Sequence, residues 1–382
     1  MDNLRSVLFV LPAHEIGGAE TKFFNIIKHL THVKCLLLTQ CSIADFFSVP
    51  GITTYTFEEF GCQTPMPFSI TSTIKYSKAI ADIARRENPD CLVGIMHTGS
   101  FYVSAAKDIF RLRIPHIGTI EGNVTAFFKI LKRPPTLIEK ALLWYILRRP
   151  SEFVVPSHGV MDDIRENFHA HERRTSVIYN GIDIDGIRKM ASETVNIRKK
   201  EGRNIIATAC RLSAQKDFVT LIRAFRAVRE KADSELIIVG DGELRDEIME
   251  IAKSLDVERD VTITGFKENP FPYIREADVF VLSSFAEGFG NVIIEAMALD
   301  VPVVASDCPS GPGEIIQNGI NGFLVPVRDH NKMAEAILKL MTDSETRNEL
   351  ISHGNERAES FRIETMAEGF RQLISEVTRE GV

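Results

Sequence analysis

The sequence has few cysteines, and none of the six lies in a C-x-x-C pair. Several of them, such as Cys35 and Cys91, sit inside apolar strand-like runs, where a free thiol behaves as a small hydrophobic side chain. This pattern does not predict a disulfide framework. We therefore expect a reducing compartment and a cytoplasmic location.

Long hydrophobic runs are absent as well. The longest wholly apolar stretch near an expected helix is Ala141–Leu147, far shorter than the roughly 20 residues that span a bilayer. The first residues, Met1–Leu11, are too few and wrongly flanked for a signal peptide. These features predict a soluble protein or one that associates peripherally with a membrane.

The sequence also lacks G-x-G-x-x-G, which argues against a dinucleotide-binding Rossmann domain. It has no repeat of solenoid period and no low-complexity tract. The formal net charge is −7, divided into +3 over residues 1–180 and −10 over the remainder. Because acids outnumber bases and no Arg/Lys stripe with interleaved aromatics extends over a face large enough for nucleic acid, we do not expect nucleic-acid binding.

What the chain does contain is an alternation of strand-like and helix-like segments in two series, which predicts two parallel sheets covered by helices. The expected strands are Val7–Leu11, Val33–Leu38, Cys91–Met96, Pro115–Ile120, Phe153–Val155 and Ser176–Tyr179 in the first series, and Asn204–Ala209, Glu235–Val239, Val261–Thr264, Asp278–Leu282, Val301–Ala305 and Gly322–Val325 in the second.

The stretch from Asn180 to Arg203 lacks a strand and precedes a new one, so we place the domain junction there. The predicted fold is α/β, with two doubly wound, Rossmann-like domains that face a central cleft. Such a cleft is the default ligand site. The first domain covers residues 1–180 and the second covers residues 200–363.

The most informative motif is Glu287-Gly288-Phe289-Gly290-Asn291, which continues to Glu295. A β-branched run precedes it and helix formers follow it, so it is a strand–loop–helix unit. Its glycines allow a ligand to approach the backbone, Asn291 can cap the helix, and the first free N–H groups attract an anion such as phosphate.

The spacing of the two acids decides between two chemistries. Eight helical residues span roughly 12 Å, whereas the two carboxyl groups of a retaining glycosidase lie about 5–5.5 Å apart. Glu287 and Glu295 therefore fit better as ligands for separate parts of one extended molecule, such as a nucleotide-sugar.

Two further motifs follow the first strand of each series. The planar guanidinium of Arg211 can bind two phosphate oxygens and the ammonium of Lys216 adds a point charge, which together suit a diphosphate. Both residues lie at the carboxyl end of a strand, where open α/β sheets bind ligands, so we favour ligand binding over ordinary solvated surface cations. Gly17 and Gly18 suit close approach to phosphate, and a simple tight turn remains an equal interpretation.

Two glycine-rich loops carry weaker signals. Gly240-Asp241-Gly242-Glu243 is interpreted as a turn. The loop from Ser306 to Glu314 is made rigid by its prolines and glycines. Two interpretations of it remain equal: it supports the neighbouring Glu287 loop, or it contacts the ligand directly.

Taken together, these residues resemble the GT-B glycosyltransferases of family 4 (glycosyltransferase group 1), a retaining family. The resemblance rests on the Gly17–Glu20 turn, Arg211 with Lys216, the Glu287–Glu295 motif and the segment Asn318–Val325, in that order. It covers nearly the whole chain and is strongest from Ile205 to Val327.

The resemblance implies roles only where residues match. Glu287 would contact hydroxyls of the donor sugar, and Glu295 would hold the ribose. Arg211 and Lys216 would bind the diphosphate, with Gly17 and Gly18 near the same phosphates. The turn Gly265-Phe266-Lys267 would flank the base. The loop Asp307–Pro312 looks like the variant found in many UDP-hexose and UDP-N-acetylhexosamine enzymes.

One departure concerns the acceptor side. Many members carry T-x-H-G, with the histidine near the anomeric centre, whereas this chain has Thr119-Ile120-Glu121-Gly122. Some members carry glutamate there, so Glu121 is a candidate catalytic residue without inheriting the histidine's role. His97 could lie in the same cleft, and an ordinary capping or core histidine is an equal interpretation.

The mechanism that we expect uses no metal and no cofactor. Arg211, Lys216 and helix N-termini can neutralise the charge that develops on a departing nucleotide diphosphate. The one D-x-D sequence, Asp183-Ile184-Asp185, lies in the linker and is interpreted as chance. The family resemblance implies front-face transfer with retention, in which the leaving phosphate helps to remove the acceptor's proton.

Residues 125–150 combine exposed-type aromatics with six cations and a single acid, Glu139. This composition favours peripheral contact with an anionic membrane on its cytoplasmic face. A partly buried helix pair with solvated lysines remains an equal alternative.

The sequence therefore predicts a GT-B enzyme whose second domain binds the donor. The first domain receives the acceptor. The family resemblance implies that the C-terminal helix, at about 364–382, crosses back to this domain. The expected reaction moves a hexose or N-acetylhexosamine from a UDP-linked sugar to a glycan or lipid-linked glycan in cell-surface polysaccharide or lipopolysaccharide synthesis. The alternatives are an epimerase-like GT-B enzyme and a non-catalytic nucleotide-sugar-binding subunit.

Overall fold

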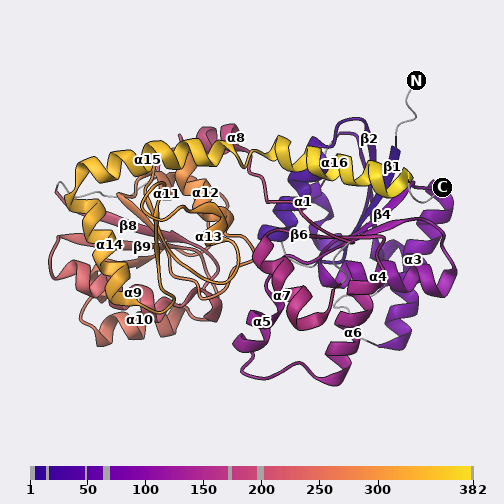
Figure 1. The fold of residues 1–382 in the computed structure, drawn as a ribbon, viewed down its shortest axis with the longest axis horizontal. Helices are drawn as coiled ribbons and strands as arrows, with labels where there is room; N and C mark the ends of the chain where they lie inside the picture. The colour runs from indigo at the N-terminus through magenta and orange to yellow at the C-terminus, as the bar shows by residue number, and fades with distance from the viewer. Residues whose placement is uncertain are drawn as a thin grey trace. The chain divides into compact units, whose positions relative to one another are not determined.

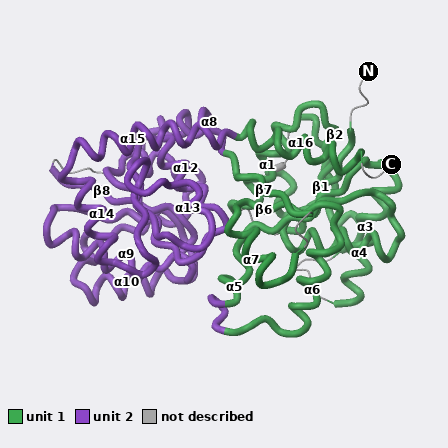
Figure 2. The backbone as a smooth tube through the Cα atoms, viewed as in Figure 1, with its two compact units in different colours: residues 1–128, 133–181, 363–382 green, residues 129–132, 182–362 purple. Residues whose placement is uncertain are grey.

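The computed structural model describes residues 5–13, 17–47, 50–62, 69–170, 174–195 and 202–379 (Figure 1). The chain forms two compact units, which Figure 2 distinguishes by colour. Unit 1 contains residues 1–128, 133–181 and 363–382, and unit 2 contains residues 182–362 together with 129–132.

Unit 1 is built on a parallel sheet that has seven strands within the described residues, in the order β3-β2-β1-β4-β5-β6-β7. The strands are β1 (Arg5–Leu11), β2 (Val33–Thr39), β3 (Ile52–Thr56), β4 (Cys91–Gly94), β5 (His116–Thr119), β6 (Glu152–Val155) and β7 (Thr175–Val177).

The central strands are apolar on both faces because helices cover both sides of the sheet. In β1, Val7, Phe9 and Leu11 pack into one core with α1 (Gly18–His29) and the C-terminal helix. Leu8 and Val10 point the opposite way and pack with α3 (Ile70–Glu87) and α4 (Met96–Phe110). Alternate residues of one strand thus belong to two separate cores.

The remaining helical segments of unit 1 lie between the strands or follow them. They are α2 (Cys41–Ala44), α5 (Val124–Ile130), α6 (Leu137–Arg148) and α7 (His158–Phe168), with single 3₁₀ turns at Asp45–Phe47 and Phe57–Phe60.

The C-terminal helix α16 (Ile363–Arg379) belongs to the core of unit 1. Its buried residues Met366, Phe370 and Ile374 recur every four positions and form one apolar stripe. The Phe370 ring meets the Phe23 ring of α1 edge to face, with centroids 6.0 Å apart. Residues 380–382, which the sequence prediction included in this helix, lie outside the described part of the chain.

Unit 2 repeats the plan with a parallel sheet of six strands among the described residues, in the order β10-β9-β8-β11-β12-β13. The strands are β8 (Asn204–Ala209), β9 (Ser234–Val239), β10 (Val261–Ile263), β11 (Val279–Leu282), β12 (Val303–Ser306) and β13 (Phe323–Val325).

Three helices pack with one face of this sheet in a single hydrophobic core, namely α9 (Phe218–Arg229), α10 (Arg245–Ser254) and α14 (His330–Thr342). The helices of unit 2 are α8 (Ile184–Met190), α9 (Phe218–Arg229), α10 (Arg245–Ser254), α11 (Phe271–Arg275), α12 (Asn291–Ala298), α13 (Pro312–Ile315), α14 (His330–Thr342) and α15 (Ser344–Glu359), with single 3₁₀ turns at Ala214–Lys216 and Glu258–Asp260.

The predicted architecture of two parallel α/β sheets is confirmed, and every predicted strand is found with small shifts at its ends. The prediction missed β3, whose sequence is Ile-Thr-Thr-Tyr-Thr. This strand lies at the edge of its sheet and is only half-buried, so it lacks the continuous apolar run that marks the inner strands.

Gly240 provides a test of the fold of unit 2. Its φ is +146°, and a Cβ there would lie 1.9 Å from the Cys210 carbonyl oxygen. We expect Gly240→Ala to lower the free energy of unfolding by about 2–5 kcal/mol, because the strained backbone and the overpacking add. Urea unfolding checks this. Gly122→Ala is the control, because its Cβ would meet nothing within 4 Å; equal stability of the two variants would contradict the packing.

Candidate active site

The loops of unit 2 that carry the predicted residues follow neighbouring strands. Strand β11 pairs with β8 on one side and with β12 on the other, and all three run parallel. Their carboxyl ends therefore meet at one edge of the sheet, where open α/β sheets bind ligands. The loop after β8 carries Arg211 and Lys216, and the loop after β11 carries Glu287.

Lys216 and Glu287 form an ion pair at this edge. The distance from Lys216 Nζ to Glu287 Oε1 is 2.6 Å, and Glu287 is only 8% exposed. Burial by itself lowers the pKa of Lys216, but the charge of Glu287 and its hydrogen bond outweigh burial and raise that pKa overall. Lys216 therefore remains charged, and the structure brings together two residues that the sequence assigned to adjacent parts of one ligand.

Arg211 lies at the start of the same loop and is exposed. Its backbone neighbour Leu212 is held from both sides, because the Leu212 N–H donates to Asp241 O (2.9 Å) and the Leu212 carbonyl accepts from Leu244 N–H (3.1 Å). Gly242, in the loop that the sequence analysis interpreted as a turn, presses against Leu212, since a Cβ there would lie 2.6 Å from the Leu212 oxygen. The turn supports the arginine loop.

The glycine-rich part of the Glu287 motif has a defined geometry. Gly290 is the N-cap of α12 with φ of +101°, and Asn291 is the first helical residue. The expectation that Asn291 caps the helix is therefore wrong, because the turn needs a left-handed residue at the position before it. Gly288 precedes Phe289, whose side chain is 2% exposed and meets the Phe361 ring with centroids 5.5 Å apart. Phe289 thus has only its backbone available to a ligand.

The loop after β12 frames this turn. Gly311 has φ of +91°, and a Cβ there would lie 2.0 Å from the Phe289 carbonyl oxygen. Only glycine allows this close approach. Of the two interpretations left open for the Ser306–Glu314 loop, this contact supports framing.

Glu295 lies one turn into α12 and is partly buried. Burial raises its pKa to about 7. Within the described residues it has no hydrogen-bond or ion-pair partner that would offset this cost. An acid kept without a partner in this way is a candidate for binding a ligand's hydroxyl groups.

Gly265, Phe266 and Lys267 follow β10 at the same edge of the sheet. Gly265 has φ of +75°, and its carbonyl accepts from Gly240 N–H at 3.1 Å. Phe266 is 75% exposed, and the Lys267 ammonium lies 5.8 Å from the centre of the Tyr273 ring. An aromatic ring held in solvent beside a fixed turn can flank a flat ligand group.

In unit 1, the predicted residues follow the neighbouring strands β1, β4 and β5. Gly17 is the N-cap of α1, and its N–H donates to Glu20 Oε2 at 2.9 Å. Gly18 is exposed, and a Cβ there would meet nothing within 4 Å. His97 is exposed and follows Met96, which has an unusual φ of +61° and donates its N–H to Thr119.

Glu121, after β5, is paired with a lysine that the sequence analysis did not single out. Lys22 of α1 is 2% exposed, and its Nζ lies 2.7 Å from Glu121 Oε2. The other carboxylate oxygen of Glu121 is buried and has no hydrogen-bond partner among the described residues. The carboxylate of Glu121 is thus compensated by a buried cation.

Within the described residues, no three His, Cys, Asp or Glu side chains gather closely enough to hold a metal ion. The two acids of the D-x-D sequence have other partners. Asp183 caps α8 by accepting from Gly186 N–H at 2.9 Å, and Asp185 pairs with Arg362 at 2.9 Å. All six cysteines are free thiols.

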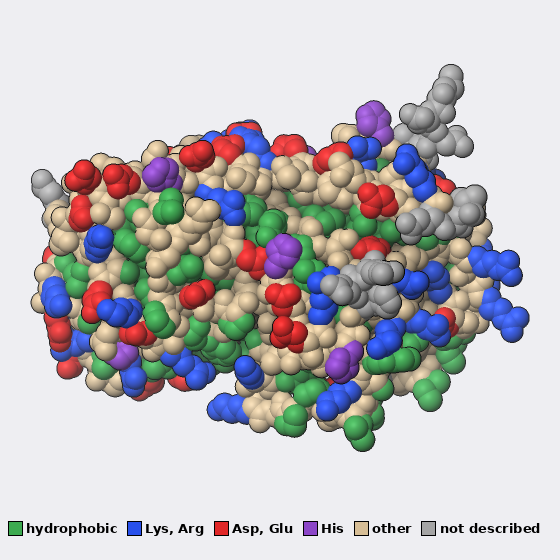
Figure 3. All heavy atoms as spheres, in the orientation of Figure 1, with side chains coloured by type: hydrophobic (Ala, Val, Ile, Leu, Met, Phe, Trp, Pro, Cys, Tyr) green, Lys and Arg blue, Asp and Glu red, His purple; other side chains and the backbone are tan. Residues whose placement is uncertain are grey.

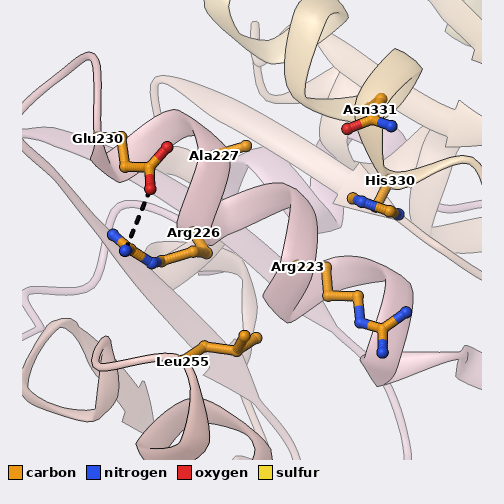
Figure 4. Close-up of a pocket in the computed structure, with 7 residues that line it drawn as sticks. All are labelled: Arg223, Arg226, Ala227, Glu230, Leu255, His330 and Asn331. Carbon is orange, nitrogen blue, oxygen red and sulfur yellow. Dashed lines mark ion pairs between the residues drawn. The ribbon is translucent and has the colours of Figure 1, made fainter.

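A pocket of unit 2 does not coincide with the predicted site. Residues of α9 and of the start of α14 line most of this pocket. In Figure 4, Arg226 turns toward Glu230, while Arg223 and His330 lie on the other side of the pocket. No residue from the carboxyl ends of the strands contributes to it. We therefore assign it no role in the site.

The sequence analysis missed Lys22, Gln215 and Ser283. Gln215 and Ser283 both join the loops after β8 and β11, through bonds of 2.7 and 2.6 Å. The position of Gln215 directly before Lys216 was the one sequence feature that could have indicated its place in the site. Lys22 gave no signal, because a lysine on an expected helix is normally solvated.

Comparison with known proteins identifies the family. The sequence pattern described as "Glycosyl transferases group 1" matches residues 191–357, and that of "Glycosyltransferase Family 4" matches residues 16–185. The chain therefore belongs to the group 1 glycosyltransferases of family 4. It is a glycosyltransferase, and the predicted resemblance is confirmed.

Two curated relatives come from Campylobacter jejuni. One, N-acetylgalactosamine-N,N'-diacetylbacillosaminyl-diphospho-undecaprenol 4-alpha-N-acetylgalactosaminyltransferase, is 31% identical over 240 residues, which are 63% of this chain and 64% of that protein. The other, GalNAc-alpha-(1->4)-GalNAc-alpha-(1->3)-diNAcBac-PP-undecaprenol alpha-1,4-N-acetyl-D-galactosaminyltransferase, is 29% identical over 380 residues, covering 98% of this chain and 99% of that protein.

Among solved structures, HepE from Anabaena, in complex with UDP and glucose, has a TM-score of 0.79 and 20% identity. The match covers 97% of this chain and 99% of HepE. A likeness at this identity concerns the fold. Together with the two parallel sheets, it establishes the GT-B fold for this chain.

The raised pKa of Glu295 predicts a pH-dependent stability. The folded pKa of about 7 exceeds the ordinary value of 4.5, so the folded state binds more protons between these values, and stability falls as pH rises through this window. We expect Glu295→Gln to be more stable than the wild type by about 1–3 kcal/mol at pH 8, and equal to it below about pH 4. Urea unfolding at both pH values measures this, and a difference that did not change with pH would contradict the burial of the charge.

Proposed function

We propose that the protein transfers a hexose or N-acetylhexosamine from a UDP-linked sugar to a glycan or lipid-linked glycan acceptor, with retention at the anomeric carbon. The observation that carries this proposal is the Lys216–Glu287 pair, 2.6 Å apart at the carboxyl edge of the sheet in unit 2, with Arg211 on the same loop as Lys216. Cations for a diphosphate and an acid for sugar hydroxyls are fixed next to each other, as a nucleotide-sugar requires.

Each part of the donor has a proposed partner in unit 2. Arg211 and Lys216 bind the diphosphate together with the backbone of Gly288, Phe289 and Gly290 and the N-terminus of α12, which begins at Asn291. Glu287 accepts hydrogen bonds from the sugar. Glu295 accepts them from the ribose.

The base and the acceptor need further groups. The exposed Phe266, between Gly265 and Lys267, is proposed to flank the base. In unit 1, Gly17 and Gly18 approach the phosphates, and His97 and Glu121 border the reacting sugar. The Campylobacter relatives, whose names specify undecaprenol-linked glycans, support a lipid-linked acceptor.

The proposed reaction is a front-face substitution. The bond between the anomeric carbon and the diphosphate oxygen breaks, the acceptor oxygen bonds to the same face, and the acceptor's proton passes to the departing phosphate. Arg211, Lys216 and the N–H groups at the start of α12 stabilise the charge that develops on the phosphate. We propose that the reaction needs neither a metal nor a cofactor, because these groups supply the positive charge.

We further propose that residues 125–150, which belong to unit 1 except for residues 129–132, contact an anionic membrane on its cytoplasmic face. Leu137 and Ile138 at the start of α6 are 85% and 73% exposed, and Trp144 on the same helix is 55% exposed. In Figure 3, hydrophobic and basic side chains lie next to one another over this segment. No helix among the described residues is long and apolar enough to cross a membrane.

The charge of this segment suits anionic lipid. Its acid, Glu139, is held by Arg133 through two bonds of 2.8 and 2.7 Å, and this pairing, with the Thr136 cap, lowers the pKa of Glu139 to about 2. Lys140 and Arg148 have no acidic partner among the described residues, and Arg148 lies 5.2 Å from the centre of the Trp144 ring. Cations beside exposed apolar side chains favour an interfacial position.

The proposed activity is tested by offering a panel of nucleotide-sugars with extracted lipid-linked glycans and analysing the products by mass spectrometry. We expect one glycosylated product from the wild type. Arg211→Ala should lower turnover by about 10²–10³-fold, because one preorganised charge at the leaving group is lost.

Arg223→Ala is the matched control, because Arg223 is an exposed arginine of the same unit outside the site. It should retain wild-type turnover. Unchanged activity in Arg211→Ala would refute the phosphate role. Epimerised sugar formed without an acceptor would favour an epimerase-like enzyme.

Membrane contact is tested by flotation with phosphatidylcholine vesicles, with and without phosphatidylglycerol, at low and high salt. The double variant Lys140→Glu/Arg148→Glu should bind anionic vesicles at least about thirtyfold more weakly than the wild type, since each of the two cations near the surface contributes about 1 kcal/mol. Lys231→Glu/Lys253→Glu in unit 2, with the same change of charge, should bind as the wild type. A wild type that does not float at low salt would rule out the contact.

A further inference from the structure

Two loops of unit 2 are joined by side chains as well as by the Lys216–Glu287 pair. Gln215 stands directly before Lys216, and its Nε2 donates to the Ala286 carbonyl oxygen at 2.7 Å. The backbone carbonyl of Gln215 accepts a hydrogen bond from Phe285 N–H at 3.1 Å. One residue of the first loop therefore binds two consecutive residues of the second, immediately before Glu287.

A second link supports the same junction. Ser283 Oγ donates to the Lys216 carbonyl oxygen at 2.6 Å. Ser283 and Ala286 are 3% and 4% exposed, so these bonds are shielded from water. Hydrogen bonds of this kind hold a loop in place, because breaking one leaves a buried polar group without a partner.

We propose that Gln215 is a positioning residue that fixes Glu287 relative to Lys216 and so shapes the donor site before any ligand binds. This inference rests on the proposed function and goes beyond it by naming a residue that the family motif does not assign. Gln215 acts on the ligand through Glu287, which it holds by the backbone of Phe285 and Ala286.

The physical reason lies in the opposite charges of the pair. In the proposed complex, the ammonium of Lys216 binds both the diphosphate and the carboxylate of Glu287. Glu287 must keep its position when the diphosphate binds, because it also binds the sugar. An ion pair alone sets one distance and leaves the loop free to rotate about it. The side-chain bond from Gln215 to the Ala286 carbonyl removes this freedom, because it adds a second anchor to the backbone bond between Phe285 N–H and the Gln215 carbonyl.

The test uses Gln215→Met in the full chain, which keeps the length of the side chain and removes its donor. The first measurement is hydrogen–deuterium exchange of the ligand-free protein. We expect faster exchange in the amides from Phe285 to Gly290, with the rest of unit 2 unchanged. This measurement needs no substrate, so it reports on the positioning even when no transfer is observed.

The second measurement is steady-state kinetics with the donor and acceptor that the wild type uses. We expect kcat/KM for the donor to fall by about 10–100-fold, since a displacement of about 1 Å at a site can cost 10² in rate. KM for the acceptor should stay unchanged, because the acceptor is proposed to bind unit 1.

Gln372→Met is the matched control. Gln372 donates from its carboxamide to Glu368 at 2.8 Å on the exposed surface of α16, so the same chemical change is made away from the site. It should match the wild type in both measurements. Ser283→Ala is the second test variant, which removes the other link and should show the same effects to a smaller degree.

The inference is overturned if Gln215→Met and Gln372→Met show equal exchange and equal donor kcat/KM. It is also overturned if Gln215→Met only lowers the melting temperature while its exchange pattern and kinetic constants remain those of the wild type. Failure of the proposed function has a different signature, in which the wild type itself consumes no nucleotide-sugar.

Discussion

A lysine and a glutamate that are largely removed from water, Lys216 and Glu287, join the loops that follow two adjacent strands of unit 2. A buried charge is costly without a partner, so neither side chain could hold its position alone. The surrounding bonds from Gln215 and Ser283, and the close approach of Gly311 to Phe289, all serve to keep this pair fixed. Arg211 and the start of α12 then lie beside it as further sources of positive charge.

Unit 1 shows the same principle in another form. Lys22 of α1 is buried and pairs with Glu121, which follows β5 and is partly buried. The carboxylate of Glu121 is accommodated because a helix residue supplies the opposite charge. Both units thus place a lysine–glutamate pair at the carboxyl edge of a parallel sheet, although the two pairs differ in which element provides the cation.

Much of this arrangement was predictable from the sequence. Continuous apolar runs identified the inner strands, and the motifs after them identified Lys216 and Glu287, which the structure brings into contact. The half-buried edge strand β3 was missed because it lacks such a run. Lys22 and Gln215 were missed because their partners, Glu121 and Ala286, are distant in the sequence, and only the folded chain brings them together. The N-cap of α12 was assigned to Asn291 rather than Gly290 because left-handed glycines cannot be distinguished from flexible ones by sequence.

The path of the chain through the two units has a consequence for biosynthesis. Almost all of unit 2 is one continuous segment, whereas the core of unit 1 includes Met366, Phe370 and Ile374 from the last helix. During translation, the amino-terminal sheet leaves the ribosome with one apolar face covered only in part, by α1. Unit 2 can complete its core first, and the amino-terminal unit must wait for the end of the chain, which reverses the usual order in which domains mature.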